Sequence, residues 1–232
     1  MKPTKAAYDE LQRAYDYFNR ELFDSNLPEC LITLQRDRRS YGYFVRSRFI
    51  EAGGETTDEI AMNPAFFAVC PPEEIMQTLV HEMIHLWQFH FGKPGRRGYH
   101  NVEWGQKMES LGLMPSSTGE PGGKKTGESV ADYIIEGGLF EEKCQDLFTQ
   151  DFKITWMDRH PVKLPGVDMP SFITDSIEHE SSGEGGDGVA GETSENKTNR
   201  WKYQCLNCKI NVWGKPNLNI VCGVCKEEFI GE

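Results

Sequence analysis

Four cysteines near the end of the chain constrain its folding more than any other feature of the sequence. They form two Cys-x2-Cys pairs that thirteen residues separate: Cys205 with Cys208, and Cys222 with Cys225. Two tight turns that each present two thiolates make a closed tetrahedron, the usual structural zinc site. A module this small has too little core to fold alone, so metal binding would drive its folding. We therefore predict a four-cysteine zinc ribbon over residues 199–232.

The alternative use of these cysteines is as disulfides, which persist in oxidising compartments. The chain starts with MKPTKAAYDELQRAYDYF, an amphipathic segment without the apolar centre of a signal peptide. We therefore expect a protein that is not secreted, in the cytoplasm, and nucleoid-associated if the source is bacterial. We also expect no membrane span, because a span needs roughly 18 consecutive apolar residues and the chain has no such run.

The net charge of −11 is distributed unevenly along the chain. Residues 168–195 contain eight acidic residues and no basic one, with Gly and Ser between them. Such a segment buries too little apolar surface to offset its ordering entropy. We therefore predict a disordered acidic linker over residues 166–198, which joins a first domain over residues 1–165 to the ribbon.

The tail beyond the linker is basic, with six basic residues and no acidic one between positions 197 and 226. Aromatic residues lie among these charges, and this combination suits single-stranded nucleic acid, since bases stack on rings and phosphates pair with Lys and Arg. A ribbon also needs aromatic residues for its own core, so the composition leaves both interpretations open. The residues that we single out as nucleic-acid contacts are Arg200, Trp201, Lys202, Lys209, Trp213 and Lys215.

The first domain combines helical and strand patterns, which predicts an α+β fold. Apolar residues recur at three- and four-residue steps between positions 8 and 22 and indicate an amphipathic helix. Another helix begins after Pro71 and Pro72, with Glu73 and Glu74 in its first turn. Between these helices we expect three short strands, the first two forming a hairpin: residues 31–34, 41–45 and 59–62.

Five arginines flank this expected hairpin. They either line a path for substrate or phosphate, or solvate the edge of the sheet and so prevent aggregation, and we favour the edge interpretation. The cluster consists of Arg36, Arg38, Arg39, Arg46 and Arg48.

The second helix carries a His-Glu-x-x-His pattern. His81 and His85 stand four residues apart, so both imidazoles project from one face of the helix. Two nitrogens on one rigid helix can bind Zn²⁺, and Glu82 beside them can take a proton from the zinc-bound water. The pattern also arises by chance, but apolar neighbours indicate a buried helix, where such residues are costly unless they are paired. We therefore predict a catalytic zinc site with Glu82 as its base.

A catalytic zinc needs a third protein ligand and keeps its fourth position for water. His90 lies nine residues after His81 and points to the opposite side of the helix, so we exclude it. Residues 92–95 end the helix and let the chain reverse, so the ligand is expected beyond them. The candidates are His100, Glu103 and Glu109, of which the spacing favours His100.

Further polar residues are candidates for supporting roles. Tyr43 and Tyr99 could stabilise an oxyanion, although a core position is the simpler interpretation for both. Asp132 and Glu128 could orient a ligand histidine, and nothing in the sequence distinguishes them.

The sequence resembles the SprT-like family of zinc metallopeptidases, which includes the Spartan proteases of eukaryotes. The resemblance covers roughly residues 5–115 and rests on YDYFNRELFDSNLP, LITLQRDRRSYGYF, IAMNP, VHEMIHLWQ and HNVEW. It implies that His81, His85 and His100 bind the catalytic zinc and that Glu82 is the general base. The family usually has Gly after the third histidine, where this chain has Asn101; we expect the ligand to be unaffected.

The resemblance implies a minimal zincin-like metalloprotease domain, with helices on a small, mostly antiparallel sheet and a substrate groove along an edge strand. With the ribbon, the expected hydrolase holds two zinc ions per chain and acts as a monomer on a protein or peptide. Spartan-type members act on proteins crosslinked to DNA, so we expect DNA binding and a role in DNA–protein crosslink repair. The alternatives are a non-catalytic nucleic-acid- or protein-binding adaptor, and a mobile-element peptidase unrelated to DNA repair. The sequence gives no role for residues 116–165.

Overall fold

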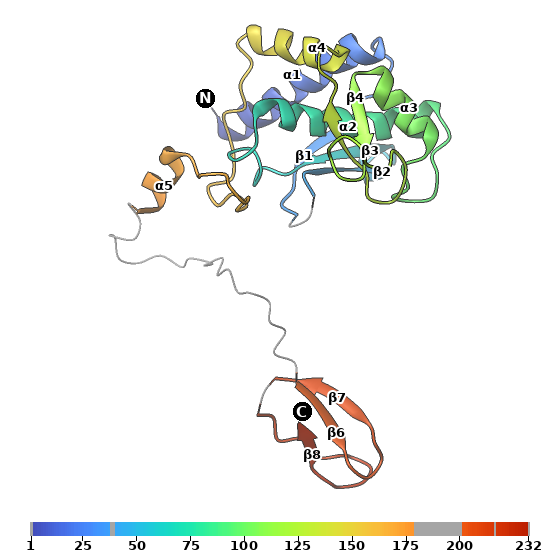
Figure 1. Cartoon of the computed structure of the whole chain (residues 1–232), viewed down its shortest axis with the longest axis vertical. Helices are drawn as coiled ribbons and strands as arrows, with labels where there is room; N and C mark the ends of the chain where they lie inside the picture. The colour runs from blue at the N-terminus through green and yellow to red at the C-terminus, as the bar shows by residue number, and fades with distance from the viewer. Residues whose placement is uncertain (1, 38–39, 179–200, 216, 232) are drawn as a thin grey trace. The chain divides into compact units, whose positions relative to one another are not determined.

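The computed structural model describes residues 2–37, 40–178, 201–215 and 217–231 (Figure 1). These residues belong to two units, one before and one after the segment 179–200. The first unit mixes helices with small sheets, which confirms the predicted α+β class. Among the described residues, none of the helices combines the length and the apolar character that crossing a bilayer requires.

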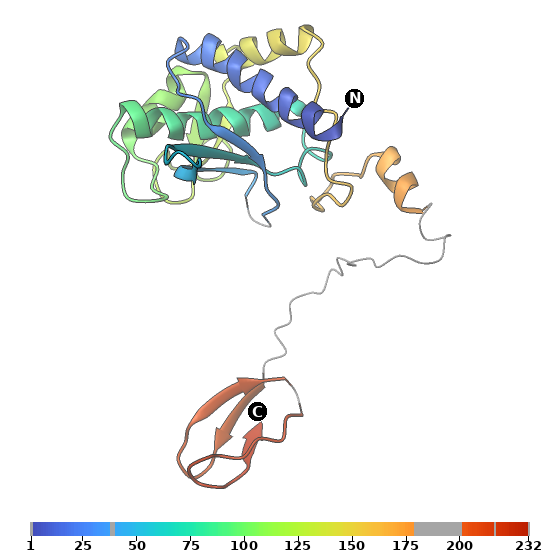
Figure 2. The ribbon, with the colours of Figure 1, turned by 180° about the vertical axis from the view of Figure 1, so that it is seen from behind.

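Helix α1 (Pro3–Phe23) is the predicted amphipathic helix, and it ends where Asp24 adopts a left-handed conformation with a φ of 54°. Its apolar stripe buries Leu11, Tyr15 and Phe18 at 2%, 0% and 0% exposure. Figure 2 shows α1 running across the back of the first unit. The helix therefore supplies one wall of the core.

The main sheet has the strand order β1-β3-β2, with β1 (Leu31–Leu34), β2 (Gly42–Ile50) and β3 (Thr56–Met62). Strand β3 pairs in parallel with β1 and antiparallel with β2. The predicted hairpin between residues 31–34 and 41–45 is therefore wrong. The pairing of β1 with β3 is parallel, whereas β2 with β3 and the two strands of a smaller sheet pair antiparallel. The reason is that Ile60, Ala61 and Met62 are at most 1% exposed, so β3 takes the central position and displaces β2 to an edge.

The arginines around this sheet do not share one partner. Arg36 pairs with the buried Asp158 at 2.6 Å, whereas Arg48 on β2 lies 3.8 Å from the carboxylate of Glu59. The guanidinium of Arg46 lies over the ring of Phe89, 5.7 Å from its centroid. Arg38 and Arg39 lie outside the described residues.

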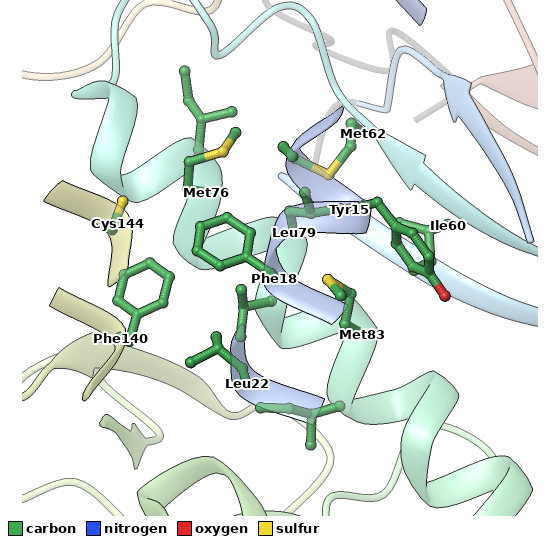
Figure 3. Packing of buried hydrophobic residues seen from close by; sticks show 14 of the residues in the cluster. Tyr15, Phe18, Leu22, Ile60, Met62, Met76, Leu79, Met83, Phe140 and Cys144 are labelled. Atoms are coloured by element: carbon green, nitrogen blue, oxygen red, sulfur yellow. The ribbon is translucent and has the colours of Figure 1, made fainter. Parts of the chain in front are cut away.

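Helix α2 (Pro72–Phe91) occupies the centre of the first unit, between the main sheet on one side and α1 and α4 (Leu139–Thr149) on the other (Figure 1). Figure 3 shows Met76, Leu79 and Met83 of α2 packed among apolar side chains from α1, β3 and α4. Helix α3 (Val102–Ser110) and a two-stranded sheet complete the unit, with β4 (Leu113–Ser116) pairing antiparallel with β5 (Ala131–Ile134).

The predicted linker over residues 166–198 is wrong in part, because Ser171–Glu178 forms helix α5. Ile173 in this helix is only 3% exposed. The acidic composition of the whole segment obscured the apolar pair Phe172 and Ile173, which follows shortly after Pro170. The remainder of the predicted linker, from residue 179 onward, lies outside the described residues, and its boundaries stay a prediction.

The second unit is a three-stranded antiparallel sheet of order β7-β6-β8, with β6 (Trp201–Cys205), β7 (Asn211–Gly214) and β8 (Phe229–Gly231). Tyr203 on the central strand is 3% exposed, and its hydroxyl donates to the carbonyl of Lys215 at 2.5 Å. The same hydroxyl accepts a hydrogen bond from the backbone N–H of Leu218 at 2.9 Å. Tyr203 therefore forms much of the small core of this unit and ties the segment around Lys215 and Leu218 to the central strand.

Gly112, between α3 and β4, is a point where the fold tolerates no side chain. Its φ is +90°, and a Cβ there would lie 2.7 Å from the backbone nitrogen of Leu139 and 2.8 Å from that of Phe140. We expect Gly112→Ala to lower the free energy of unfolding by about 3 kcal/mol, because backbone strain and a contact with immobile atoms add. Gly122→Ala is the matched control, since Gly122 has a φ of +94° and a Cβ added there would meet nothing within 4 Å; about 1 kcal/mol is expected. Urea denaturation of the full chain measures both, and equal losses would contradict the packing argument.

Candidate metal centre

Three histidines converge in the first unit, two from helix α2 and one from the loop before α3. His81 and His85 lie one turn apart on α2, and His100 lies just before α3. The candidate ligand nitrogens of the three lie within 4.8 Å of one another, with 3.1 Å between Nε2 of His85 and Nε2 of His100. This spacing suits one metal ion held by three imidazoles.

A network of polar side chains brings His100 to this position. The side-chain oxygen of Asn101 accepts from the backbone N–H of Trp104 at 3.0 Å and so caps α3. The Asn101 amide donates to the carbonyl of Lys93 at 2.9 Å, and Gln88 on α2 donates to the Asn101 oxygen at 2.7 Å. Asn101 therefore fixes the loop between α2 and α3, a role that the sequence did not reveal.

The rival third ligands are held elsewhere. The carboxylate of Glu103 accepts from Gln88 at 2.8 Å and from the backbone N–H of Lys93 at 2.6 Å. Glu109 pairs with Lys125 at 3.0 Å. His90, which we excluded, lies 2.6 Å from Asp58. Of the candidates that the sequence left open, the structure brings only His100 to the two histidines of α2.

Hydrogen bonds fix the orientation of two of the imidazoles. Nδ1 of His81 lies 2.8 Å from a carboxylate oxygen of Asp132, and Nδ1 of His100 lies 3.1 Å from the carbonyl oxygen of Gly127. Both partners are acceptors, so each Nδ1 carries the proton and each Nε2 offers its lone pair. Of the two carboxylates that the sequence could not separate, Asp132 contacts a ligand, whereas Glu128 pairs with Arg96 at the surface.

The surroundings of His85 and His100 favour neutral rings. Burial lowers the pKa of His85 well below its ordinary value, and the neighbouring His81 and His100 add to this effect. Burial, together with the charge of His81, lowers the pKa of His100 to about 4. For His81 burial also lowers the pKa, but its bond to Asp132 and the negative charges of Glu82 and Asp132 outweigh burial and raise it. Burial thus favours the neutral form of His85 and His100, which is the form that binds a metal.

Glu82 points from α2 into the same site and is 6% exposed. Burial raises the pKa of its carboxyl to about 7, an effect that the charge of His81 opposes and that of Asp132 reinforces. A carboxyl group with a pKa near neutrality can both accept and return a proton, which is the requirement for general acid–base chemistry.

Trp104, in the HNVEW segment, packs against all three histidines. Its ring centroid lies 4.9, 5.1 and 4.4 Å from those of His81, His85 and His100, and it is stacked on His85 with an interplanar angle of 25°. The side chain is completely buried. It therefore closes the side of the site that faces the core.

A groove of about 630 Å³ opens beside His81 and Glu82. Its walls are α2, the start of β2 with Gly42, and residues 130–134 around β5. The tyrosines that line it are Tyr41 and Tyr133, not the Tyr43 and Tyr99 that we considered as oxyanion donors. The groove therefore borders the start of β2, an edge strand of the main sheet, and the whole of β5.

The four cysteines of the second unit also come together. Their sulfurs lie within 4.8 Å of one another, and those of Cys208 and Cys222 are 3.6 Å apart, far beyond the roughly 2.05 Å of a disulfide. Backbone N–H groups of Cys225 and Val224 lower the pKa of Cys222 to about 7. Stabilised thiolate in a closed set of four sulfurs suits a structural metal site.

The predicted nucleic-acid contacts lie on this unit, except for Arg200, which is outside the described residues. Trp201 and Trp213 are 43% and 63% exposed. Lys202 on β6 is paired in register with Trp213 on β7. A charge and an exposed ring thus share one part of the sheet, while Lys209 and Lys215 follow in the adjoining turns.

Comparison with known proteins identifies similarity to one family. The model described as the SprT-like family matches residues 11–121. The chain is also 59% identical over 59 residues to a protein of Salmonella typhimurium described as "Uncharacterized protein in mucB 3'region", an alignment that covers 25% of this chain and 80% of that protein. No solved structure matches the chain. The family match ends before Gly127 and Asp132, the partners of two of the histidines.

Metal content tests both candidate sites. We expect two zinc ions per full chain by elemental analysis, and one in His85→Ala, because the cysteine site lies in the other unit. Cys208→Ala should likewise retain only the histidine-bound ion. Two ions in His85→Ala, or fewer than two in the unaltered chain, would contradict the assignment.

Proposed function

We propose that this chain, because it belongs to the SprT-like family, is a zinc-dependent endopeptidase with its active site at His81, His85 and His100. The observation that carries the proposal is Glu82, a buried carboxyl group next to His81 and on the wall of a groove. A purely structural metal site does not require a buried carboxyl group beside its ligands.

In peptide hydrolysis the residues of the site would have separate roles in metal binding, ligand orientation and proton transfer. The three histidines would hold the metal, and Asp132 and the Gly127 carbonyl keep the protons of His81 and His100 on Nδ1, which leaves Nε2 of these two rings free to bind it. When bound, zinc supplies a Lewis acid that polarises the scissile carbonyl and acidifies water. Glu82 accepts the proton of the attacking water and returns it to the leaving amine.

The groove suits an extended peptide. Its walls include the beginning of edge strand β2 and the whole of β5, and an extended chain can add to such an edge through backbone hydrogen bonds. The walls also carry side chains of mixed character, from Val130 and Ile134 to Gln77 and Thr78. A substrate that binds mainly through its backbone is selected little by its side chains. Such binding fits an enzyme that cleaves many sequences.

We extend the proposal to substrates that are bound or crosslinked to DNA, with the zinc ribbon as the contact to single-stranded DNA. Support comes from Trp213, which is 63% exposed beside Lys202. The described part of the ribbon up to Lys226 carries four lysines and no acidic residue. The alternative function, a non-catalytic adaptor, accounts for the ribbon but leaves Glu82 without a purpose.

Glu82→Gln tests the enzymatic proposal. The variant should keep both zinc ions and lose about 10²–10⁴-fold in the cleavage rate of an unfolded protein, because the amide cannot accept the proton. Glu109→Gln is the control, since Glu109 pairs with Lys125 away from the histidines, and it should cleave at the normal rate. Assays with and without single-stranded DNA separate a DNA-dependent protease from an ordinary one. Undiminished cleavage by Glu82→Gln would remove Glu82 from the mechanism.

Trp213→Ala tests the DNA contact. Loss of one stacked base should weaken the binding of a labelled single-stranded oligonucleotide by roughly 5- to 150-fold, or about 1–3 kcal/mol. Lys202→Ala should instead reduce the slope of affinity against salt concentration by about 0.7. Leu206→Ala, at an exposed apolar position of the ribbon, is the control. If Trp213→Ala and Lys202→Ala bind like the unaltered chain, the ribbon face is not the DNA contact.

A further inference from the structure

Asp132 is a buried carboxylate whose two oxygens have separate partners. One oxygen lies 2.8 Å from Nδ1 of His81, and the other accepts from the side-chain amide of Gln77, also at 2.8 Å. The same Gln77 amide lies 2.8 Å from the backbone carbonyl oxygen of Asp132. The Asp132 side chain is only 5% exposed. The position is on β5, beyond the residues that the family comparison matches.

This arrangement decides which nitrogen of His81 is available. A neutral imidazole carries one N–H, and the carboxylate of Asp132 holds that proton on Nδ1. The lone pair of Nε2 is then left for the metal, and a negatively charged partner makes that nitrogen a stronger donor. Without Asp132, the proton could occupy either nitrogen and the ring could rotate.

Gln77 fixes the carboxylate in turn. Gln77 and His81 are four residues apart, so they neighbour each other on the same face of α2. Both contact Asp132, so β5 is attached to α2 at the ligand itself. Because residues 130–134 also form one wall of the groove, the metal ligand and this wall depend on one carboxylate.

We propose that Asp132 is a positioning residue for the catalytic metal, which fixes His81 for binding through Nε2 and is itself held by Gln77. The proposal rests on the zinc site proposed above. It differs from a purely structural role, in which Asp132 would join β5 to α2 and contribute equally to the stability of the metal-free and metal-bound protein.

The affinity of the histidine site for metal distinguishes the two roles. We would measure zinc affinity by competition with a chromophoric chelator, on full chains that keep zinc at the cysteine site. Asp132→Ala should lose about 10- to 100-fold in affinity. Asp132→Asn should lose less, because the amide oxygen still accepts from His81 but lacks the charge. Glu128→Gln is the matched control: Glu128 is in the same segment but 63% exposed and paired with Arg96, so no change is expected.

Two further measurements complete the test. Cobalt bound at the histidine site should show an altered visible spectrum in Asp132→Ala, since ring orientation changes the ligand field. The thermal unfolding temperature of the first unit, measured in chains without metal at the histidine site, should change little between the variants. Unchanged metal affinity in Asp132→Ala overturns the proposal, as does equal destabilisation of the metal-free and metal-bound forms.

Should Asp132→Ala fail to fold, Asp132→Asn and Gln77→Ala carry the test. Gln77→Ala leaves the Asp132–His81 pair but frees the carboxylate, so it should weaken metal binding less than Asp132→Ala. Unchanged affinity in both variants would overturn the proposal. If the unaltered chain binds no metal at its histidines, the proposed function fails as well, and the measurement on the unaltered chain shows this before any variant is compared.

Discussion

Burial of helix α2 is the constraint on which the rest of the first unit depends. Leu79, Val80, Met83, Ile84 and Leu86 are all completely buried, so the helix packs against the sheet and the other helices on most of its surface. Such a helix cannot rotate or shift without loss of the core (Figure 3). The same burial desolvates Glu82 and the neighbouring histidines, and thereby sets the pKa values that make the site suitable for metal binding and proton transfer.

Features with a local cause could be predicted from the sequence, whereas those that depend on distant residues could not. The helix periodicity placed His81 and His85 on one face, and the cysteine spacing indicated the closed sulfur cluster. The strand order was missed because it depends on which strand is buried on both sides, a property of the whole sheet. Asp132 lies 51 residues from His81 in the chain, so no spacing rule could select it over Glu128. The sequence favoured His100 over the two glutamates, but only the Asn101 network explains why.

The two candidate metal sites differ in the number of protein ligands and in the amount of core around them, as expected for a structural and a catalytic site. The four cysteines would enclose an ion on all sides, and apart from Cys205 and Cys222 the described residues of their unit bury one large apolar side chain, that of Tyr203, so a bound ion would supply folding energy. The histidine set occupies three sides and faces a groove, in a unit that already has an extensive core. Loss of metal should therefore unfold the ribbon but leave the first unit folded.

The candidate metal site includes residues that lie beyond the segment matched by the family model. The match ends at residue 121, yet the partner of His100 is Gly127 and that of His81 is Asp132. Backbone hydrogen bonds in both directions also join His100 to Gly127. A fragment that ended with the match would keep the three histidines and Glu82 but lose the acceptors that orient two of the rings, together with one wall of the groove. The segment through Ile134 therefore belongs to the candidate metal site as much as the His-Glu-x-x-His helix does.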